Sequence, residues 1–287
     1  MTPRRVPLRD GEPLALRDGE SLAIRDAGRG RPALLVHGFT GSAAAWGEQL
    51  LAALAAELRV IAVDLLGHGA SSRPARPERY ALAEQVADLC EVLDACGVRD
   101  ALWIGYSMGG RIALAAACLR PEHVAGLVLE GASPGLREPA ERAARIASDA
   151  ALAERLLRDG IGPFVDGWMA QPLFATQRRI GAARLAAERE RRLRGDPRAL
   201  AACLRGAGTG AQPPLWDRLA GIRAPALLLA GDEDEKFREL AATMARALPR
   251  ALAQTIPGAG HATHLERPDA FTRAVRGFAR RVLEEER

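Results

Sequence analysis

The sequence predicts an α/β protein with a mostly parallel, doubly wound sheet and a helical insertion. Short apolar runs, such as residues 33–36 and 59–63, alternate with amphipathic helical patterns. This alternation is typical of parallel strands joined by right-handed crossovers. It stops between residues 134 and 213, where Ala- and Arg-rich helical patterns follow one another without a candidate strand. We therefore expect a core formed by residues 1–133 and 214–287, with a helical cap over residues 134–213.

The elements follow in chain order. Residues 6–36 contain Arg-Asp-Gly-Glu twice, at 9–12 and 17–20, between alternating apolar positions, which predicts antiparallel edge strands joined by hairpins. Unbroken apolar runs predict buried strands that end near residues 36, 63, 106, 130 and 230. A short last strand is expected at 251–256. Helical periodicity appears at 83–96, 108–119 and 268–284.

The composition limits the choice of partner and compartment. The chain has 287 residues, is 48% hydrophobic and carries a formal charge of +4. It contains no basic tract with interleaved aromatic residues and no apolar run of transmembrane length, so we expect neither nucleic acid nor a membrane as a partner. The four cysteines lack C-x-x-C spacing and favour buried thiols in a reducing cytoplasm. No cluster has metal-ligand spacing, so no metal or cofactor is expected, and we expect a monomer or a weak homo-oligomer.

The most informative motif is Gly105-Tyr106-Ser107-Met108-Gly109. It lies between an apolar strand and an Ala/Leu-rich helical pattern, which is the context of a nucleophile elbow. The glycines allow a tight turn and close packing. The motif therefore predicts that Ser107 is an exposed nucleophile at the carboxyl edge of the sheet.

A serine hydroxyl needs a base, and that base needs an orienting carboxylate. Two later strands end at Gly-Asp-Glu-Asp (231–234) and Gly-Ala-Gly-His (258–261). Serine, acid and histidine then follow one another in the order that this architecture uses. We predict Ser107, Asp234 and His261 as a triad; Asp232 and Glu233 compete for the role of the acid, with Asp232 otherwise interpreted as a solvated turn residue.

The remaining histidines are expected to be structural. His264 competes with His261 but is better interpreted as structural or substrate-lining. His37, His68 and His123 are expected in turns or on the surface. The backbone N–H groups of Phe39 and Met108 are predicted to form an oxyanion hole.

These features resemble the α/β-hydrolase superfamily over nearly the full length of the chain. A narrower resemblance is to the 2-succinyl-6-hydroxy-2,4-cyclohexadiene-1-carboxylate synthases of menaquinone biosynthesis. It is carried by five segments: Tyr-Ser-Met-Gly-Gly-Arg at 106–111, the cap residues 141–149 and 168–174, Leu-Arg-Gly-Ala-Gly-Thr-Gly at 204–210, and Glu-Lys-Phe at 235–237. The Gly-Thr-Gly and Glu-Lys-Phe parts are not general features of the superfamily.

The resemblance implies a lyase that removes a ring proton and expels an enolpyruvyl group as pyruvate. Ser107 would act as the base, and no acyl-enzyme would form. Arginines would bind a small polycarboxylate substrate: Arg111, one helical turn after the serine, Arg145, and Arg192, for which Arg189 and Arg191 remain rivals. Tyr106 and Trp168 would also line the substrate site. The alternative is a serine ester or thioester hydrolase with the same triad.

Overall fold

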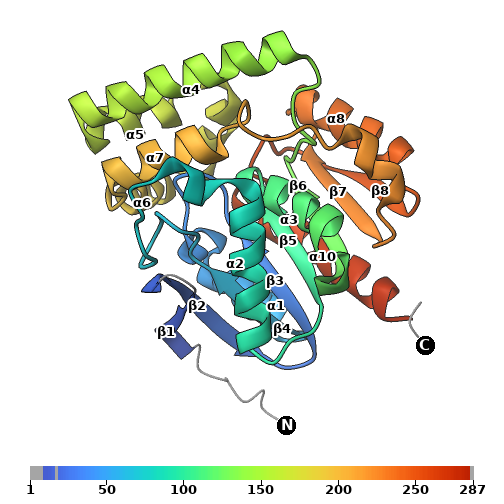
Figure 1. Ribbon diagram of the computed structural model, residues 1–287. Coiled ribbons are helices and arrows are strands. Elements are labelled where there is room, and N and C mark those ends of the chain that lie inside the picture. The colour runs from blue at the N-terminus through green and yellow to red at the C-terminus, as the bar shows by residue number, and fades with distance from the viewer. Residues whose placement is uncertain (1–8, 17–18, 285–287) are drawn as a thin grey trace.

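The computed structural model describes residues 9–16 and 19–284. Its centre is one eight-stranded sheet with the order β1-β2-β4-β3-β5-β6-β7-β8 (Figure 1). The strands are β1 (Arg9–Ala15), β2 (Ser21–Gly28), β3 (Arg31–Val36), β4 (Leu58–Val63), β5 (Ala101–Tyr106), β6 (Val124–Glu130), β7 (Ala226–Gly231) and β8 (Ala251–Ile256).

The α-helices and short 3-10 helices connect these strands. The α-helices are α1 (Glu48–Ala55), α2 (Leu82–Ala95), α3 (Met108–Leu119), α4 (Pro139–Asp159), α5 (Ile161–Met169), α6 (Ala182–Leu193), α7 (Pro197–Ala207), α8 (Glu235–Ala247), α9 (Thr263–Glu266) and α10 (Pro268–Glu284). The 3-10 helices are η2 (Ala43–Trp46), η3 (Pro77–Tyr80), η4 (Pro121–His123), η5 (Pro172–Ile180) and η6 (Trp216–Gly221).

The strand directions confirm the predicted fold class. The strands from β4 to β8 in the sheet order pair in parallel. Strand β2 is antiparallel to both β4 and β1, as predicted for the amino-terminal edge. Part of that prediction, at residues 6–8 and 17–18, lies outside the described residues.

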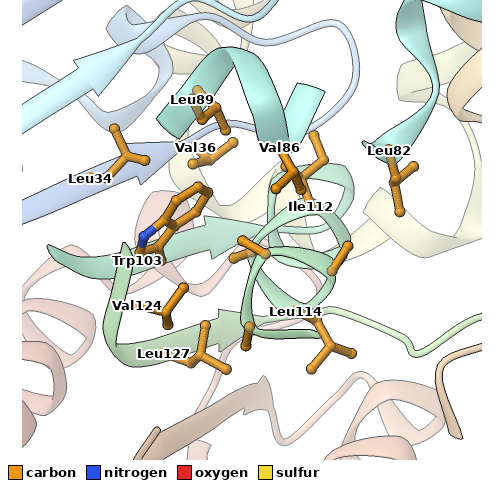
Figure 2. Close-up of a cluster of buried hydrophobic side chains, with 14 of the residues drawn as sticks. Leu34, Val36, Leu82, Val86, Leu89, Trp103, Ile112, Leu114, Val124 and Leu127 are labelled. Carbon is orange, nitrogen blue, oxygen red and sulfur yellow. The ribbon is translucent and has the colours of Figure 1, made fainter. Parts of the chain in front are cut away.

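The unbroken apolar strands are explained by burial on both faces of the sheet. In β3, Leu34 and Val36 join one core cluster, whereas Ala33 and Leu35 join the other. Figure 2 shows the first cluster, where Trp103 of β5 lies among side chains of neighbouring strands and helices. Helices α2, α3 and α8 cover this face, while α1 and α10 cover the opposite face. Because successive side chains alternate between two buried faces, both sets of positions in the central strands are mostly apolar.

Within the described chain, the predicted cap segment consists of helices and loops and contains no strand. Helices α4 to α7 and η5 lie between β6 and β7 in sequence and gather at one end of the sheet (Figure 1). They share a small apolar core that includes Leu156, Phe164 and Leu200. In the described residues, no helix is both long enough and apolar enough to cross a membrane.

Candidate active site

Ser107 lies at a strained turn between β5 and α3. Its backbone has φ 51° and ψ −107°, a conformation that residues other than glycine rarely adopt. A Cβ atom on Gly109 would lie 2.0 Å from the Val36 carbonyl oxygen, and one on Gly105 would lie 2.4 Å from the Gly109 carbonyl oxygen. The two glycines therefore allow α3 to begin directly against the sheet, so the strain is maintained by the surrounding packing.

The structure brings the three predicted triad side chains together. His261 Nε2 lies 3.3 Å from Ser107 Oγ, and His261 Nδ1 lies 2.8 Å from Asp234 Oδ2. Ser107 follows the end of β5, Asp234 follows the end of β7, and His261 follows the end of β8. His261 and Asp234 are buried. Asp234 also accepts a hydrogen bond from the N–H of Phe237 at the start of α8, so one carboxylate orients both the imidazole and the helix.

The two rival acids have other partners. Asp232 Oδ1 accepts hydrogen bonds from the N–H groups of Gly258 and Ala259, and these bonds hold the pKa of Asp232 below its usual range. Glu233 pairs with Arg179 of the cap. Asp232 lies in the turn after β7 and is partly exposed, as interpreted, and its carboxylate also joins this turn to the loop that leads to the histidine.

The two predicted oxyanion donors are the N–H groups of Phe39 and Met108. Within the described chain, neither of them has a hydrogen-bond acceptor. Met108 is the first residue of α3, where a helix leaves its N–H groups without intrahelical partners. Both residues line the cavity above Ser107. The arrangement can therefore accept a negatively charged oxygen beside the serine.

His37 and His68 lie in the loops that follow β3 and β4, as expected, but both side chains are buried rather than at the surface. His37 donates from Nδ1 to the Gly38 carbonyl and accepts at Nε2 from the Leu65 N–H, which fixes the loop that carries Phe39. Burial lowers the pKa of His37 to about 4 and that of His68 to about 3. Both imidazoles are therefore neutral at physiological pH.

A cavity of about 1290 Å³ opens above the triad, between the sheet and the cap. Three of the predicted substrate residues, Arg111, Arg145 and Trp168, line it. Arg111 is buried and donates to the side chain of Gln212 and the carbonyl of Ala207. Burial lowers the pKa of Arg111 to about 10, which leaves its guanidinium charged at neutral pH.

The other two predicted substrate residues that line the cavity, Arg145 and Trp168, come from the cap. Arg145 Nε donates to Asp149 at 2.8 Å, one turn along α4, and its side chain is 43% exposed. Trp168 stacks on Phe164 and meets the ring of Phe39 edge to face at 5.2 Å. The cavity thus has a charged inner end at Arg111 and an aromatic wall.

Tyr106 and Arg192 are not brought to the surface of this cavity. Tyr106 packs against the rings of His261 and His264, and burial raises its pKa well above its usual value. Arg192 lies near this tyrosine and pairs with buried Glu188 at 2.9 Å. Its two rivals are also engaged in ion pairs, Arg191 with Glu188 and Arg189 with Asp166.

Sequence reasoning missed Glu130, the last residue of β6. Its carboxylate is fully buried and accepts from the Thr263 hydroxyl at 2.7 Å and the His264 N–H at 2.9 Å, while its second oxygen lies 2.8 Å from His264 Nδ1. His264 is therefore a structural residue beside the loop of His261. An acidic residue that ends a continuous apolar strand was the available signal, because a buried carboxylate requires partners.

Comparison with known proteins agrees with this architecture. The sequence pattern of the alpha/beta hydrolase family matches residues 33–274, and the chain belongs to that family. Its relatives are more specific. The chain is 41% identical over 243 residues to a Bacillus subtilis protein provisionally named 2-succinyl-6-hydroxy-2,4-cyclohexadiene-1-carboxylate synthase, a match that covers 85% of this chain and 88% of that protein. The synthase of the same name from Serratia proteamaculans is 33% identical over 250 residues, with 86% and 93% covered.

Two solved structures are similar over most of their length. The structure of MenH from S. aureus has a TM-score of 0.86 and 32% identity, and covers 91% of this chain and 98% of that one. A malate-bound thermophilic esterase from Thermogutta terrifontis has a TM-score of 0.81 and 28% identity, with 97% and 99% covered. Sequence identity and structure together place the chain among the 2-succinyl-6-hydroxy-2,4-cyclohexadiene-1-carboxylate synthases.

Proposed function

We propose that the protein is a carbon–oxygen lyase of menaquinone biosynthesis. It converts 2-succinyl-5-enolpyruvyl-6-hydroxy-3-cyclohexene-1-carboxylate into 2-succinyl-6-hydroxy-2,4-cyclohexadiene-1-carboxylate and pyruvate. The observation that carries the proposal is a buried, charged guanidinium, that of Arg111, in the cavity that the triad faces. A buried cation is unfavourable unless an anion compensates it, and the proposed substrate supplies carboxylates.

The triad geometry suits proton abstraction by the serine. His261 Nε2 takes the proton of Ser107 Oγ, and Asp234 stabilises the resulting imidazolium. The serine oxygen then removes a proton from the substrate ring. The electrons of that C–H bond form a new ring double bond, the existing ring double bond shifts by one position, and the C–O bond to the enolpyruvyl group breaks. The enolate of pyruvate leaves and takes up a proton at its methylene carbon as it becomes the ketone, while His261 gives up the proton that it took from Ser107.

The N–H groups of Phe39 and Met108 would hold the negative charge that develops on a substrate oxygen or carboxylate. Loss of one such donor typically costs about 3 kcal/mol of transition-state stabilisation. Arg111 and Arg145 would each bind a carboxylate of the substrate, because a guanidinium fork matches a carboxylate. Trp168 would form the apolar wall against the ring.

A serine ester or thioester hydrolase is the second candidate, because the Thermogutta terrifontis esterase shares the fold at 28% identity. In that case Ser107 would attack an acyl carbon, and an acyl-enzyme would form. The inner cation distinguishes the two functions, since a pocket for neutral esters is mostly apolar.

One assay separates the candidates. The enolpyruvyl precursor is supplied to the purified protein, and pyruvate release is followed together with the absorbance of the diene. We expect equal amounts of both products, and no activity in Ser107→Ala. Absence of pyruvate, together with hydrolysis of simple esters, would reject the lyase and support the hydrolase.

We also infer the setting in which the enzyme works. The four cysteines are free thiols, which agrees with a reducing cytoplasm. The partner we propose is the small polycarboxylate substrate, without nucleic acid or a membrane, and the protein is expected to act as a monomer or a weak homo-oligomer. Size-exclusion chromatography with light scattering tests the last point.

A further inference from the structure

The protein contains a single lysine. Of its 40 Lys and Arg residues, 39 are arginine, and the exception is Lys236. The chain therefore uses arginine almost wherever a cation is needed. Lysine differs from arginine as a compact, strongly hydrated charge on a flexible stem, without a planar fork. A lysine that stands against so strong a bias marks a position where this difference can matter.

Lys236 lies at the catalytic cavity and close to the triad. Its side chain is exposed and lines the cavity above Ser107. It is two residues after Asp234, whose carboxylate caps α8 through the N–H of Phe237 and also contacts His261. The ring of Phe237 is 4.5 Å from that of His261, and the lysine Nζ is 5.8 Å from the Phe237 ring. The acid of the triad thus fixes the base of the lysine side chain.

The position is unfavourable for helix stability. Lys236 is in the first turn of α8, where the helix dipole favours acidic residues and disfavours cations. In the described chain, no carboxylate lies within ion-pair distance of the Lys236 Nζ. This includes the carboxylate of Glu239, which is on the next turn of the helix. An unpaired cation placed against the helix dipole is explained if its partner is a ligand.

Five cations line the cavity, and three are engaged by the protein. Arg111 and Arg145 have the partners described above, and Arg137 lies 4.2 Å from the centre of a tryptophan ring. Within the described residues, Arg155 and Lys236 have no ion pair, and the contact of Lys236 with the Phe237 ring, at 5.8 Å, is longer than that of Arg137. Arg155 belongs to the cap, whereas Lys236 is attached to the triad, so its distance from the reacting atoms does not depend on the cap.

We propose that Lys236 is a specificity residue that binds a carboxylate of the substrate at the outer end of the cavity. The inference rests on the proposed function, whose substrate has three carboxylates: on the succinyl group, on the enolpyruvyl group and on the ring. Arg111 and Arg145 account for two of them, and Lys236 provides the third contact. An arginine at this position would stack on the neighbouring phenylalanine ring and direct its planar fork elsewhere.

The kinetic test compares Lys236→Arg and Lys236→Gln with the wild type. For both variants, we expect KM for the precursor to rise about tenfold with kcat nearly unchanged, as for the loss of one charge-assisted contact. Arg246→Gln on the same helix removes an exposed charge away from the cavity and controls for net charge. The urea midpoint should not fall in either variant. Lys236→Gln removes an unfavourable cation from the first turn of α8, and Lys236→Arg keeps the same charge there.

A single lysine also allows a direct binding test without turnover. Acetylation by an N-hydroxysuccinimide ester can modify only Lys236 and the terminal amine, and peptide mass spectrometry measures the two rates separately. The cyclohexadiene product or pyruvate should slow the labelling of Lys236 severalfold and leave that of the terminal amine unchanged. Protection by the product assigns a ring or succinyl carboxylate to Lys236, and protection by pyruvate assigns the enolpyruvyl carboxylate.

The outcomes separate this inference from the proposed function. A wild-type protein that releases no pyruvate refutes the proposed lyase, whatever Lys236 does. A wild-type lyase with unchanged KM in Lys236→Arg, or with no protection by either ligand, overturns the role of Lys236 alone. A large fall in the urea midpoint of Lys236→Gln also overturns it, because the residue would then be structural.

Discussion

Glu130 offers the sharpest test of how the catalytic loop is held. Its buried carboxylate receives the Thr263 hydroxyl and the N–H and ring of His264, only two and three residues beyond His261. In Glu130→Ala these three groups remain buried without an acceptor. A hydrogen bond to a charged group contributes about 1.5 kcal/mol or more, so three of them predict a loss of about 4–5 kcal/mol in the free energy of unfolding.

Such a loss is comparable to the total stability of many domains, which is about 5–15 kcal/mol. Urea titration followed by tryptophan fluorescence measures it, and Trp46 is a local reporter because its ring lies 4.8 Å from that of His264. Glu130→Gln retains one acceptor oxygen and should lose about half as much. Glu122→Gln, at an exposed position, is the control and should stay within about 0.5 kcal/mol of the wild type.

The reasoning fails on a specific result. If Glu130→Ala loses less than about 1 kcal/mol, its three donors find other partners and the carboxylate does not hold the loop. Activity should fall together with stability in Glu130→Ala, because His261 lies in the loop that Glu130 holds. Full activity in a destabilised variant would show that the histidine is positioned by Asp234 alone.

Three further predictions follow from the packing, the buried histidines and the inner arginine. Gly109→Ala should be strongly destabilised and inactive, because its new Cβ would lie 2.0 Å from a backbone carbonyl oxygen of β3, whereas Gly277→Ala on α10, with nothing within 4 Å, should unfold at the same or higher urea concentration. The low pKa values of His37 and His68 mean that the unfolded chain binds protons near pH 6.5 while the folded protein does not, so stability should fall as pH drops from 6.5 towards 4. His37 alone should contribute about 3 kcal/mol of this loss, and urea midpoints at pH 7, 6 and 5 would contradict the reasoning if they stayed constant. Arg111→Ala should reduce kcat/KM for the precursor at least a hundredfold, as expected when a buried charged contact is lost, and retention of wild-type kinetics would remove Arg111 from the substrate site.

The cap segment contacts two core residues at the site, Arg111 and Met108. Arg111 of the core donates to Gln212 and Ala207, near the end of the cap segment, and Cys203 of α7 contacts Met108 beside the nucleophile. The same arginine thus supports the cap and lines the cavity. In the proposed function, cap position and substrate binding would therefore be linked through this one side chain.

The sequence by itself determined the fold class and the three strand ends that carry the triad. Local sequence patterns indicate both. Apolar runs predict strands that are buried on two faces, and the glycines at 105 and 109 predict the tight turn at Ser107. A parallel sheet then brings the carboxyl ends of its strands to one edge, so residues far apart in sequence become neighbours without further information.

Only the tertiary structure decided which side chains meet within that edge. It selected Asp234 from three adjacent acids, placed Arg111 and Arg145 in the cavity, and left Arg192 against Glu188. It also buried His37, which local sequence placed in a turn. Such choices depend on packing between segments separated by many residues, and side-chain direction there is set by the neighbours that fill the space rather than by the periodicity of the chain.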